Sequence, residues 1–384
     1  MSQINVDIIL PQSSNVVGVN GVNISSPLGD PLNVAFGNGG LSMVSGSNTT
    51  LIGSGAGGSL TTGNQNTAVG TYALISCTTG NSNTAVGMNS LYANVTGSNN
   101  IAIGANALIS STGSSDNVAI GRDALKLYNG FPGNVAIGRN ALRDLVSNVQ
   151  NTAVGYQSLE KETGSNNTAF GYASLVSSTA GNDNTAFGSS AGYLLTSGNG
   201  NTSIGNNAGY KLTSGSDNIF LGNALAGNAS LNSGNNNILI GAGATYPATP
   251  NVSNSITLGN SSHNVLRCAV TTITSLSDER DKKEIEELPV GLEFVEKLKP
   301  VKFTWDDRNE EGKHDVEDFG FIAQDLKASQ EEANASYLGL VYEENPEKLE
   351  ASYGKLLPVL VKAIQELSSE VKSLKEELET LKNK

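Results

Sequence analysis

The sequence has little of several residue types on which enzymes and nucleic-acid-binding proteins depend. Its 384 residues include two histidines, two cysteines and one tryptophan. Because soft metal sites need clustered histidine and cysteine, we expect no metal site and no cofactor. Cys77 and Cys268 are too few for a disulfide framework and are expected to be small buried residues. No basic patch is present, which argues against nucleic acid as a partner.

Long apolar runs are also missing, and charge is scarce over most of the chain. No stretch of about 18 apolar residues exists, so we expect no membrane insertion. The first residues, Met1 to Asp7, carry no positive charge and no long apolar segment, so no secretory signal is expected there. Of the charged residues, 27 acidic and 16 basic ones lie beyond residue 274, against 9 and 7 before it. This division predicts two parts with different roles.

The first two thirds of the chain contain a repeat with a period near 17 residues. Each unit reads Asn-Thr-Ala-Val-Gly, then two variable residues, then Ala or Ser followed by Leu or Gly; residues 66–70 with Ala73 and Leu74 are one example. A fixed period of this length indicates a solenoid in which each repeat forms one coil. The repeats close with these glycines: Gly37, Gly53, Gly70, Gly87, Gly104, Gly121, Gly138, Gly155, Gly171, Gly188, Gly205, Gly222, Gly241 and Gly259.

The five-residue motif alternates as a β-strand does, which divides its side chains between two faces. We expect the Thr/Ile/Val and Val/Ile/Phe positions to be buried, as at Thr67, Val69 and Phe170, and the Ala-Leu side to pack against other chains. The glycine ends the strand where the backbone turns with positive φ or approaches a neighbour. The opening asparagine is expected to tolerate a left-handed conformation and to form ladders between coils.

This repeat resembles the head of trimeric autotransporter adhesins, a left-handed parallel β-roll of Asn-Ser-x-Ala-Ile-Gly-like units, although the period here is longer. The resemblance implies a homotrimer. Carboxylates of the repeat are scattered, so the facing pair that a glycosidase needs is not expected. A binding or spacer shaft is the remaining interpretation, with a host cell-surface glycan or receptor as its candidate partner.

A nonapeptide marks the boundary between the two parts: Ser-Asp-Glu-Arg-Asp-Lys-Lys-Glu-Ile at residues 277–285. Taken alone, the pattern is also typical of a helix start with Ser277 as the N-cap. Three further blocks follow in order, at 291–305, 320–324 and 356–367. The ordered set resembles the endosialidase-type intramolecular chaperone domain. That domain is found at the C-terminus of phage tail spikes and fibres and of some membrane-bound transcription factors.

That resemblance implies a domain that trimerises the β-structured shaft and then acts once, as a serine endopeptidase, on its own chain. The family motif Ser-Asp-x-Arg-x-Lys-x-x-Ile maps to Ser277, Asp278, Arg280, Lys282 and Ile285. It implies Ser277 as nucleophile, Lys282 as its base, and Asp278 and Arg280 as supporting residues. A serine hydroxyl needs such a base, and a lysine amine serves when burial lowers its pKa from about 10.4 toward 7 to 8. We expect that burial only when three chains close around the site.

The expected scissile bond is Leu276–Ser277, which the Ser277 hydroxyl attacks to give an ester that water opens; the Ser277–Asp278 bond is the alternative. Two positions depart from the family pattern, since Asp281 stands where Leu is usual and Glu284 where Asn is usual. An additional acid beside the lysine favours the charged form of its amine, so slower cleavage is expected.

Beyond the motif, the sequence pattern predicts a small α+β domain. Helical spacing covers 290–298 and 325–332, whereas strands are expected at 301–305, 320–324 and 337–342.

Phe303, Trp305 and Phe321 are expected in the core of this domain. A coiled coil is expected to follow the domain. A helix as short as the terminal one must self-associate to be stable. The mixed residues at its a positions do not discriminate between a dimer and a trimer. The expectation of a trimer comes from the two family resemblances. The heptad positions are a at Leu357, Ile364, Val371 and Leu378, and d at Leu360, Leu367, Leu374 and Leu381.

The chain is therefore predicted to be mostly β, in five segments. Residues 1–32 form a cap or an attachment segment, 33–260 the trimeric parallel β-solenoid of about 17-residue coils, and 261–276 a stalk. Residues 277–355 form the self-cleaving α+β domain, and 356–384 the coiled coil.

The predicted function is that of a homotrimeric tail-fibre-like virion protein, assembled in the host cytoplasm, with a self-cleaving C-terminal chaperone. The alternative is a structural trimeric adhesin on a bacterial surface, whose C-terminal domain is a permanent clamp. A Ser-His-Asp triad through His314 stays a lesser alternative to the Ser277–Lys282 pair.

Overall fold

The chain divides into two compact units, with the boundary after Asn260. None of the helices that the structure describes is long and apolar enough to cross a membrane. The computed structural model describes residues 16–19, 22–25, 33–36, 46–148, 150–223, 233–243, 251–260, 277–306, 314–343 and 349–383.

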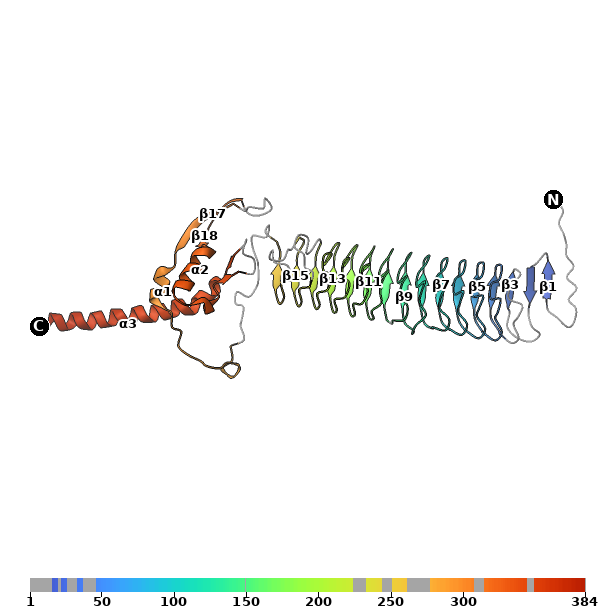
Figure 1. Cartoon of the computed structure of the whole chain (residues 1–384), viewed down its shortest axis with the longest axis horizontal. Coiled ribbons are helices and arrows are strands. Elements are labelled where there is room, and N and C mark those ends of the chain that lie inside the picture. Colours follow the sequence, from blue (N-terminus) through green and yellow to red (C-terminus); the bar gives the residue numbers. More distant parts are fainter. Residues whose placement is uncertain are drawn as a thin grey trace. The chain divides into compact units, whose positions relative to one another are not determined.

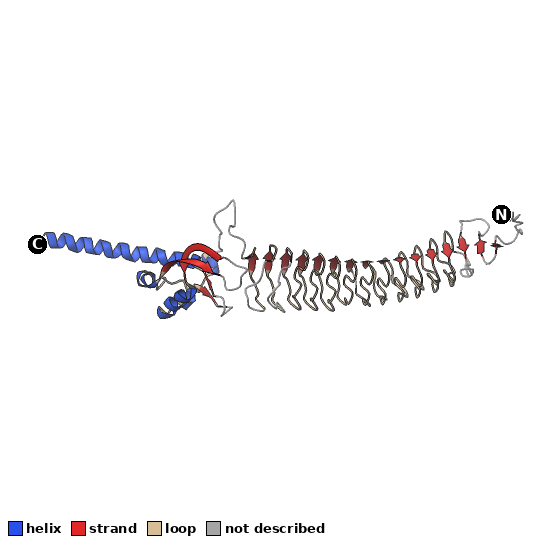
Figure 2. Ribbon diagram, turned by 90° about the horizontal axis from the view of Figure 1, so that it is seen from above, coloured by secondary structure: helices blue, strands red, loops and turns tan. Residues whose placement is uncertain are grey.

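The first unit is a solenoid in which fourteen three-residue strands form one parallel sheet, each strand pairing in register with the same repeat positions of the next coil (Figure 1). An antiparallel pair, β1 (Val16–Val19) and β2 (Val22–Ser25), precedes this sheet in the chain. Figure 2 shows the strands along one side of the solenoid and the loops along the other. The strands are β3 (Val34–Phe36), β4 (Thr50–Ile52), β5 (Thr67–Val69), β6 (Thr84–Val86), β7 (Ile101–Ile103), β8 (Val118–Ile120), β9 (Val135–Ile137), β10 (Thr152–Val154), β11 (Thr168–Phe170), β12 (Thr185–Phe187), β13 (Thr202–Ile204), β14 (Ile219–Leu221), β15 (Ile238–Ile240) and β16 (Ile256–Leu258).

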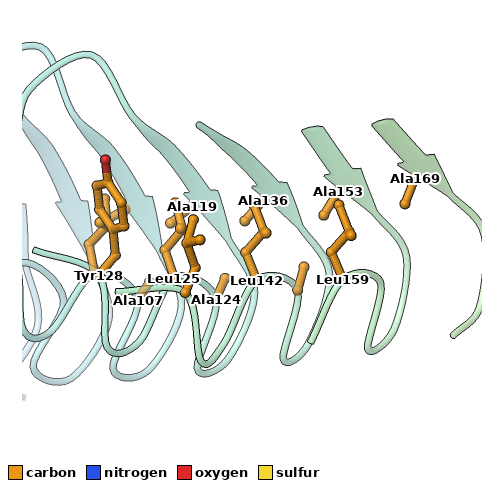
Figure 3. Packing of buried hydrophobic residues seen from close by; sticks show 14 of the residues in the cluster. Ala107, Ala119, Ala124, Leu125, Tyr128, Ala136, Leu142, Ala153, Leu159 and Ala169 are labelled. Carbon is orange, nitrogen blue, oxygen red and sulfur yellow. The ribbon is translucent and has the colours of Figure 1, made fainter. Parts of the chain in front are cut away.

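The strand face that was expected to be buried points outward, and the face that was expected to lie outside is buried. The central alanine points into the solenoid and is fully buried, as at Ala68, whereas Phe170 in the third position is 47% exposed. Thr67 and Val69 are only partly buried, so the expected burial of these two positions was wrong. The Ala-Leu side is the interior of the coil rather than an outer surface, as the stacked Ala and Leu side chains in Figure 3 show.

The reason for this reversal is volume, because a 17-residue coil leaves a thin interior that close packing must fill. A leucine from the loop side occupies most of this space, and only alanine fits opposite it. At two loop glycines the facing strand centre is larger: a Cβ on Gly57 would lie 2.6 Å from Leu51, and one on Gly209 would lie 3.0 Å from the Phe220 ring. The larger β-branched and aromatic residues are therefore placed outside.

The same loop position explains why the repeat admits either leucine or glycine there. Leu74 and Leu125 have φ of 53° and 47°, and Gly57 and Gly192 take the same repeat position at 58° and 61°. A left-handed conformation suits glycine and is uncommon for leucine. Full burial of the leucine side chains in the interior offsets this strain.

Asparagine ladders hold successive coils together, as the sequence predicted. The Asn100 side-chain nitrogen donates to the Ser114 carbonyl at 2.8 Å, and its Oδ1 accepts from the backbone and side-chain nitrogens of Asn117 at 3.1 and 3.3 Å. The left-handed conformation that the opening asparagine was expected to tolerate is not adopted by the ladder residue. That conformation belongs to the residue before it, such as Asn99 with φ of 58°.

A second interior column runs three residues after the repeat leucine, and its members are chemically mixed. Cys77 lies in this column and is buried as expected, and burial raises the pKa of its thiol to about 11. Glu162 is fully buried there too, and burial, which outweighs its hydrogen bonds, raises the pKa of the carboxyl. The column consists of Leu60, Cys77, Asn94, Ser111, Tyr128, Leu145, Glu162, Ser178, Leu195 and Leu212.

Glu162→Leu is expected to stabilise the protein by about 1 to 3 kcal/mol at pH 8, because four other coils hold leucine in this column and a buried charge is costly. The pKa of the Glu162 carboxyl in the folded state lies above its ordinary value of 4.5. The wild type therefore loses stability as the pH rises above that ordinary value. The variant should lack this loss. Urea unfolding of both proteins at pH 5 and pH 8 measures it.

Glu160 provides the matched control, since it is 4% exposed and paired with Arg143. Glu160→Leu should destabilise the protein at both pH values, because it leaves the guanidinium without that partner. Equal pH profiles for the wild type and Glu162→Leu would contradict the prediction.

The second unit is a small α+β domain followed by a long helix. Strands β17 (Pro300–Asp306) and β18 (His314–Phe321) are antiparallel, as are β19 (Val341–Tyr342) and β20 (Glu350–Ala351). The helices are α1 (Leu292–Lys297), α2 (Ala323–Glu332) and α3 (Leu356–Lys382), with 3-10 turns η1 (Glu279–Asp281), η2 (Ser336–Leu338) and η3 (Tyr353–Lys355).

Most elements of this domain match the sequence prediction, with two differences at element ends. The strand expected at 320–324 ends at Phe321, because α2 begins at Ala323. The segment 337–342 starts as the turn η2 and is extended only in β19. Of the aromatics expected in the core, Trp305 is 40% exposed in the single chain. The core consists of Phe294, Leu326, Ala335, Leu340, Val341, Leu356 and Val359.

Helix α3 has two apolar faces. Leu356, Val359 and Ala363 are buried near its start. The eight heptad residues lie elsewhere on the helix and are all exposed, between 40% and 67%. The long helix is thus confirmed, and its association into a coiled coil stays a prediction.

Some predicted features lie outside the described residues and stay predictions. These are most of the cap or attachment segment 1–32, the closing Gly37, the stalk at 261–276 with Cys268 and Leu276, and the side chain of His314.

Candidate active site

The motif residues surround the single turn η1, whose start is capped by Asp278. The Asp278 carboxylate accepts hydrogen bonds from the Arg280 backbone nitrogen at 2.9 Å and from the Arg280 guanidinium at 2.9 and 2.5 Å. These bonds from Arg280 hold the pKa of the Asp278 carboxyl below its usual value. The N-cap is therefore Asp278 and not Ser277, which leaves the serine hydroxyl available for another contact.

The turn brings the two predicted catalytic side chains together. Lys282 follows the turn as its C-cap, with its backbone nitrogen donating to the Glu279 carbonyl at 3.0 Å. From there its amine reaches back and donates to the Ser277 hydroxyl oxygen at 2.5 Å and to the Ser277 carbonyl at 3.3 Å. An amine at this distance can take the proton of the hydroxyl once it is neutral.

The site is open to solvent in the single chain. Every residue from Ser277 to Glu287 is exposed, and Ile285, the last motif residue, is 64% exposed. The single chain therefore has the contact between nucleophile and base but not the burial that a lysine general base requires.

The two departures from the family pattern have different structural consequences. Asp281 lies within η1, and within the described residues neither Asp281 nor Glu284 forms an ion pair with Lys282. Glu284 has φ of 53°, a left-handed conformation that asparagine tolerates better than glutamate. The expected slowing by an added acid stays a prediction, whereas the backbone at 284 fits the asparagine that is usual there.

The segment after the motif is attached to helix α3. Glu287 pairs with Lys362 at 3.3 Å, and the backbone nitrogen of Leu292 donates to the Glu366 carboxylate at 2.7 Å. Both α3 partners lie in the heptad region, close to Ile364 and Leu367.

The described residues contain no cluster of histidine, cysteine and carboxylates suited to a metal ion. Among the described residues of this domain, the Ser277–Lys282 pair brings a nucleophile and a base into contact. Sequence reasoning selected both residues through the motif, but it did not find the Asp278 cap that leaves the serine hydroxyl available to the lysine.

A repeat solenoid followed by a small α+β domain and a long helix fits a tail-fibre-like protein with a C-terminal chaperone. Residues 277–334 match the family model described as chaperone of endosialidase, a family of self-cleaving intramolecular chaperones, which confirms the resemblance seen in the motif. Comparisons with curated proteins and with solved structures found no match.

Proposed function

We propose that the chain is the protomer of a homotrimeric tail-fibre-like protein whose C-terminal domain assembles the solenoid and then cuts itself from it at Leu276–Ser277. The observation that carries the proposal is the 2.5 Å contact between the Lys282 amine and the Ser277 hydroxyl, inside a segment matched by a self-cleaving chaperone family. On this proposal the protein is a virion component assembled in the host cytoplasm.

The chemistry is an acyl shift followed by hydrolysis. The neutral Lys282 amine takes the proton of the Ser277 hydroxyl, and the hydroxyl oxygen attacks the carbonyl carbon of Leu276. The peptide C–N bond breaks as the ester C–O bond forms, and the lysine returns the proton to the released Ser277 amine. Water then hydrolyses the ester, which frees the Leu276 carboxylate and restores the serine hydroxyl.

Assembly is proposed to supply what the single chain lacks. Three copies around the heptad stripe of α3 would exclude water from the motif and favour the neutral amine. The exposed aromatic face of the β17–β18 hairpin, where Phe319 is 83% exposed, provides further apolar surface for neighbouring copies. An apolar hollow of about 510 Å³, lined in part by Phe319, Tyr353 and Leu360, lies beside this face. Cleavage would then report a completed trimer.

The exposure of Ser277 and Lys282 is also the observation that favours the alternative. If assembly leaves this site in water, the domain trimerises the solenoid without cutting it. The protein would then be a trimeric adhesin with a permanent clamp, and a bacterial surface is its proposed place.

Mass spectrometry of the purified protein distinguishes the two functions. The wild type is expected to yield the 108-residue fragment 277–384, whereas Ser277→Ala and Lys282→Ala should remain intact trimers. Lys283→Ala is the matched control, since it removes the neighbouring amine and should still be cut. An intact wild-type trimer would establish the permanent clamp instead.

A further inference from the structure

Although no basic patch was expected from the sequence, the few basic residues of the solenoid are gathered in one place. Seven basic residues precede residue 275, and five of them lie between residues 122 and 161, in the coils that contain β8, β9 and β10. The same repeat positions in most other coils hold small or neutral residues. Since the repeat itself does not require charge at these positions, this concentration indicates a local function. The five residues are Arg122, Lys126, Arg139, Arg143 and Lys161.

The repeat places part of this cluster in one outward column. The residue after the closing glycine is Arg122, Arg139, Tyr156 and Tyr172 in four successive coils, whose strands β8 to β11 pair in register. The rings of Tyr156 and Tyr172 are stacked, with centroids 5.4 Å apart and planes at 6°. The Arg139 guanidinium lies 5.8 Å from the centre of the Tyr156 ring. We call these four residues the Arg–Tyr column.

A hollow of about 370 Å³ lies beside this column and opens to solvent. Its wall combines charged, amide and apolar groups, which is the mixture that holds a polar ligand in a fixed orientation. The lining residues are Asp123, Lys126, Leu127, Arg139, Asn140, Arg143 and Asp144.

Among the described residues, the ion pairs of the cluster leave Arg139 and Lys161 without a carboxylate partner, and of these two Arg139 lines the hollow. The carboxylates beside the hollow are already held: the pairs are Arg122–Asp123 at 3.2 Å, Lys126–Asp123 at 3.1 Å, Arg143–Asp144 at 2.8 Å and Arg143–Glu160. Among the described residues no carboxylate pairs with Arg139, which is exposed between the hollow and the stacked tyrosines. A network that served stability alone would not need this arginine, because stacking it next to Arg122 adds like-charge repulsion.

We propose that the Arg–Tyr column and the adjoining hollow bind an acidic oligosaccharide. The planar guanidinium of Arg139 suits a sugar carboxylate, with which it can form two parallel hydrogen bonds. The stacked faces of Tyr156 and Tyr172 suit the apolar face of a sugar ring, and Asn140 can bond its hydroxyl groups.

The charge balance favours a glycan over a polyanion such as nucleic acid. The hollow is lined by three cations and two carboxylates, so its excess of positive charge is small. A trimer would present the site three times, which raises the effective affinity for a glycan-covered surface. This inference goes beyond self-cleavage and does not depend on it.

The test uses the full-length protein on an array of sialylated and uronate-containing oligosaccharides, printed beside their neutral counterparts. We expect retention on the carboxylated glycans only. With the strongest array ligand in solution, Arg139→Ala and Tyr156→Ala should each weaken binding by about 10- to 100-fold, and Arg139→Lys less, because it keeps the charge but loses the planar fork. Ser277→Ala should bind as the wild type does, which separates this result from self-cleavage.

Two controls remove similar groups elsewhere on the solenoid. Lys211→Ala deletes a charge outside the cluster, and Tyr193→Ala disrupts the other stacked tyrosine pair, Tyr193–Tyr210, at 5.0 Å. Both should bind as the wild type does. The proposal is overturned if no carboxylated glycan is retained, if neutral counterparts bind equally, or if Arg139→Ala binds unchanged with its thermal unfolding also unchanged.

Discussion

A chain carrying Leu367→Asp and Leu374→Asp is expected to stay monomeric and uncut. Both leucines occupy d positions of the heptads and are 48% and 64% exposed in the single chain. Burying such a side chain between helices contributes about 1.5 to 3 kcal/mol, and each substitution would also place a carboxylate in the seam, in every copy. The domain's own core uses Leu356 and Val359 in the first turn of α3, well before the two substituted leucines, so the fold of the monomer should survive.

Sedimentation measures the oligomer, and mass spectrometry measures the cut in the same sample. Ser369→Asp with Thr380→Asp adds the same charge at exposed positions outside the a and d seam, and this control should trimerise and cleave normally. A trimer of the leucine variant would show that the heptads are not the assembly surface. A variant that is monomeric yet cut would show that the Ser277–Lys282 pair reacts without assembly.

The sequence predicted the period and strand positions of the solenoid well, because glycine and asparagine carry constraints of the backbone and of the ladder. It did not reveal which strand face lies inside. Alternation separates Thr67 and Val69 from Ala68 but carries no information on the thickness of the coil. That thickness decides the outcome, since the space opposite Leu74 admits only a small side chain.

The left-handed leucines also went unforeseen, although a signal for them exists. Gly57 and Gly192 stand where other coils have Leu74 or Leu125. Glycine at a repeat position that is otherwise leucine is a signal for positive φ, because glycine adopts that conformation without strain. The Arg–Tyr column has a comparable signal, namely charge and aromatic residues at positions that are neutral in most repeats.

The candidate active site could be found from sequence only through the motif. The spacing of Ser277 and Lys282 does not itself imply contact, which depends on the turn η1 and its Asp278 cap. Exposure of the pair could not be predicted either, because the motif identifies the residues and carries no information on what packs around them. Trp305, expected in the core, is likewise exposed in the single chain.

Gly138→Ala is expected to be among the most destabilising single substitutions in the solenoid. Gly138 has φ of 135°, and an added Cβ would lie 2.3 Å from the carbonyl oxygen of Gly155 in the next coil. The added Cβ is fixed to the backbone after β9, and the oxygen belongs to the backbone after β10. Neither atom can move without separating β9 from β10. Strained φ and overpacking together should cost about 2 to 6 kcal/mol.

Gly113→Ala is the matched control in the same solenoid. Gly113 is exposed and lacks positive φ, and its added Cβ would meet only the Thr96 hydroxyl, at 3.2 Å. Urea unfolding of the full-length proteins should show a large loss for Gly138→Ala and a change within about 0.5 kcal/mol for Gly113→Ala.

Hydrogen exchange shows where the loss falls, because each coil of a solenoid contacts only its neighbours. In Gly138→Ala the amides of β9 and β10 should exchange fastest, and protection should recover toward both ends of the sheet. Equal unfolding midpoints for the two alanine variants would mean that the coils separate without cost at this glycine. The column of closing glycines would then owe its regularity to something other than close backbone approach.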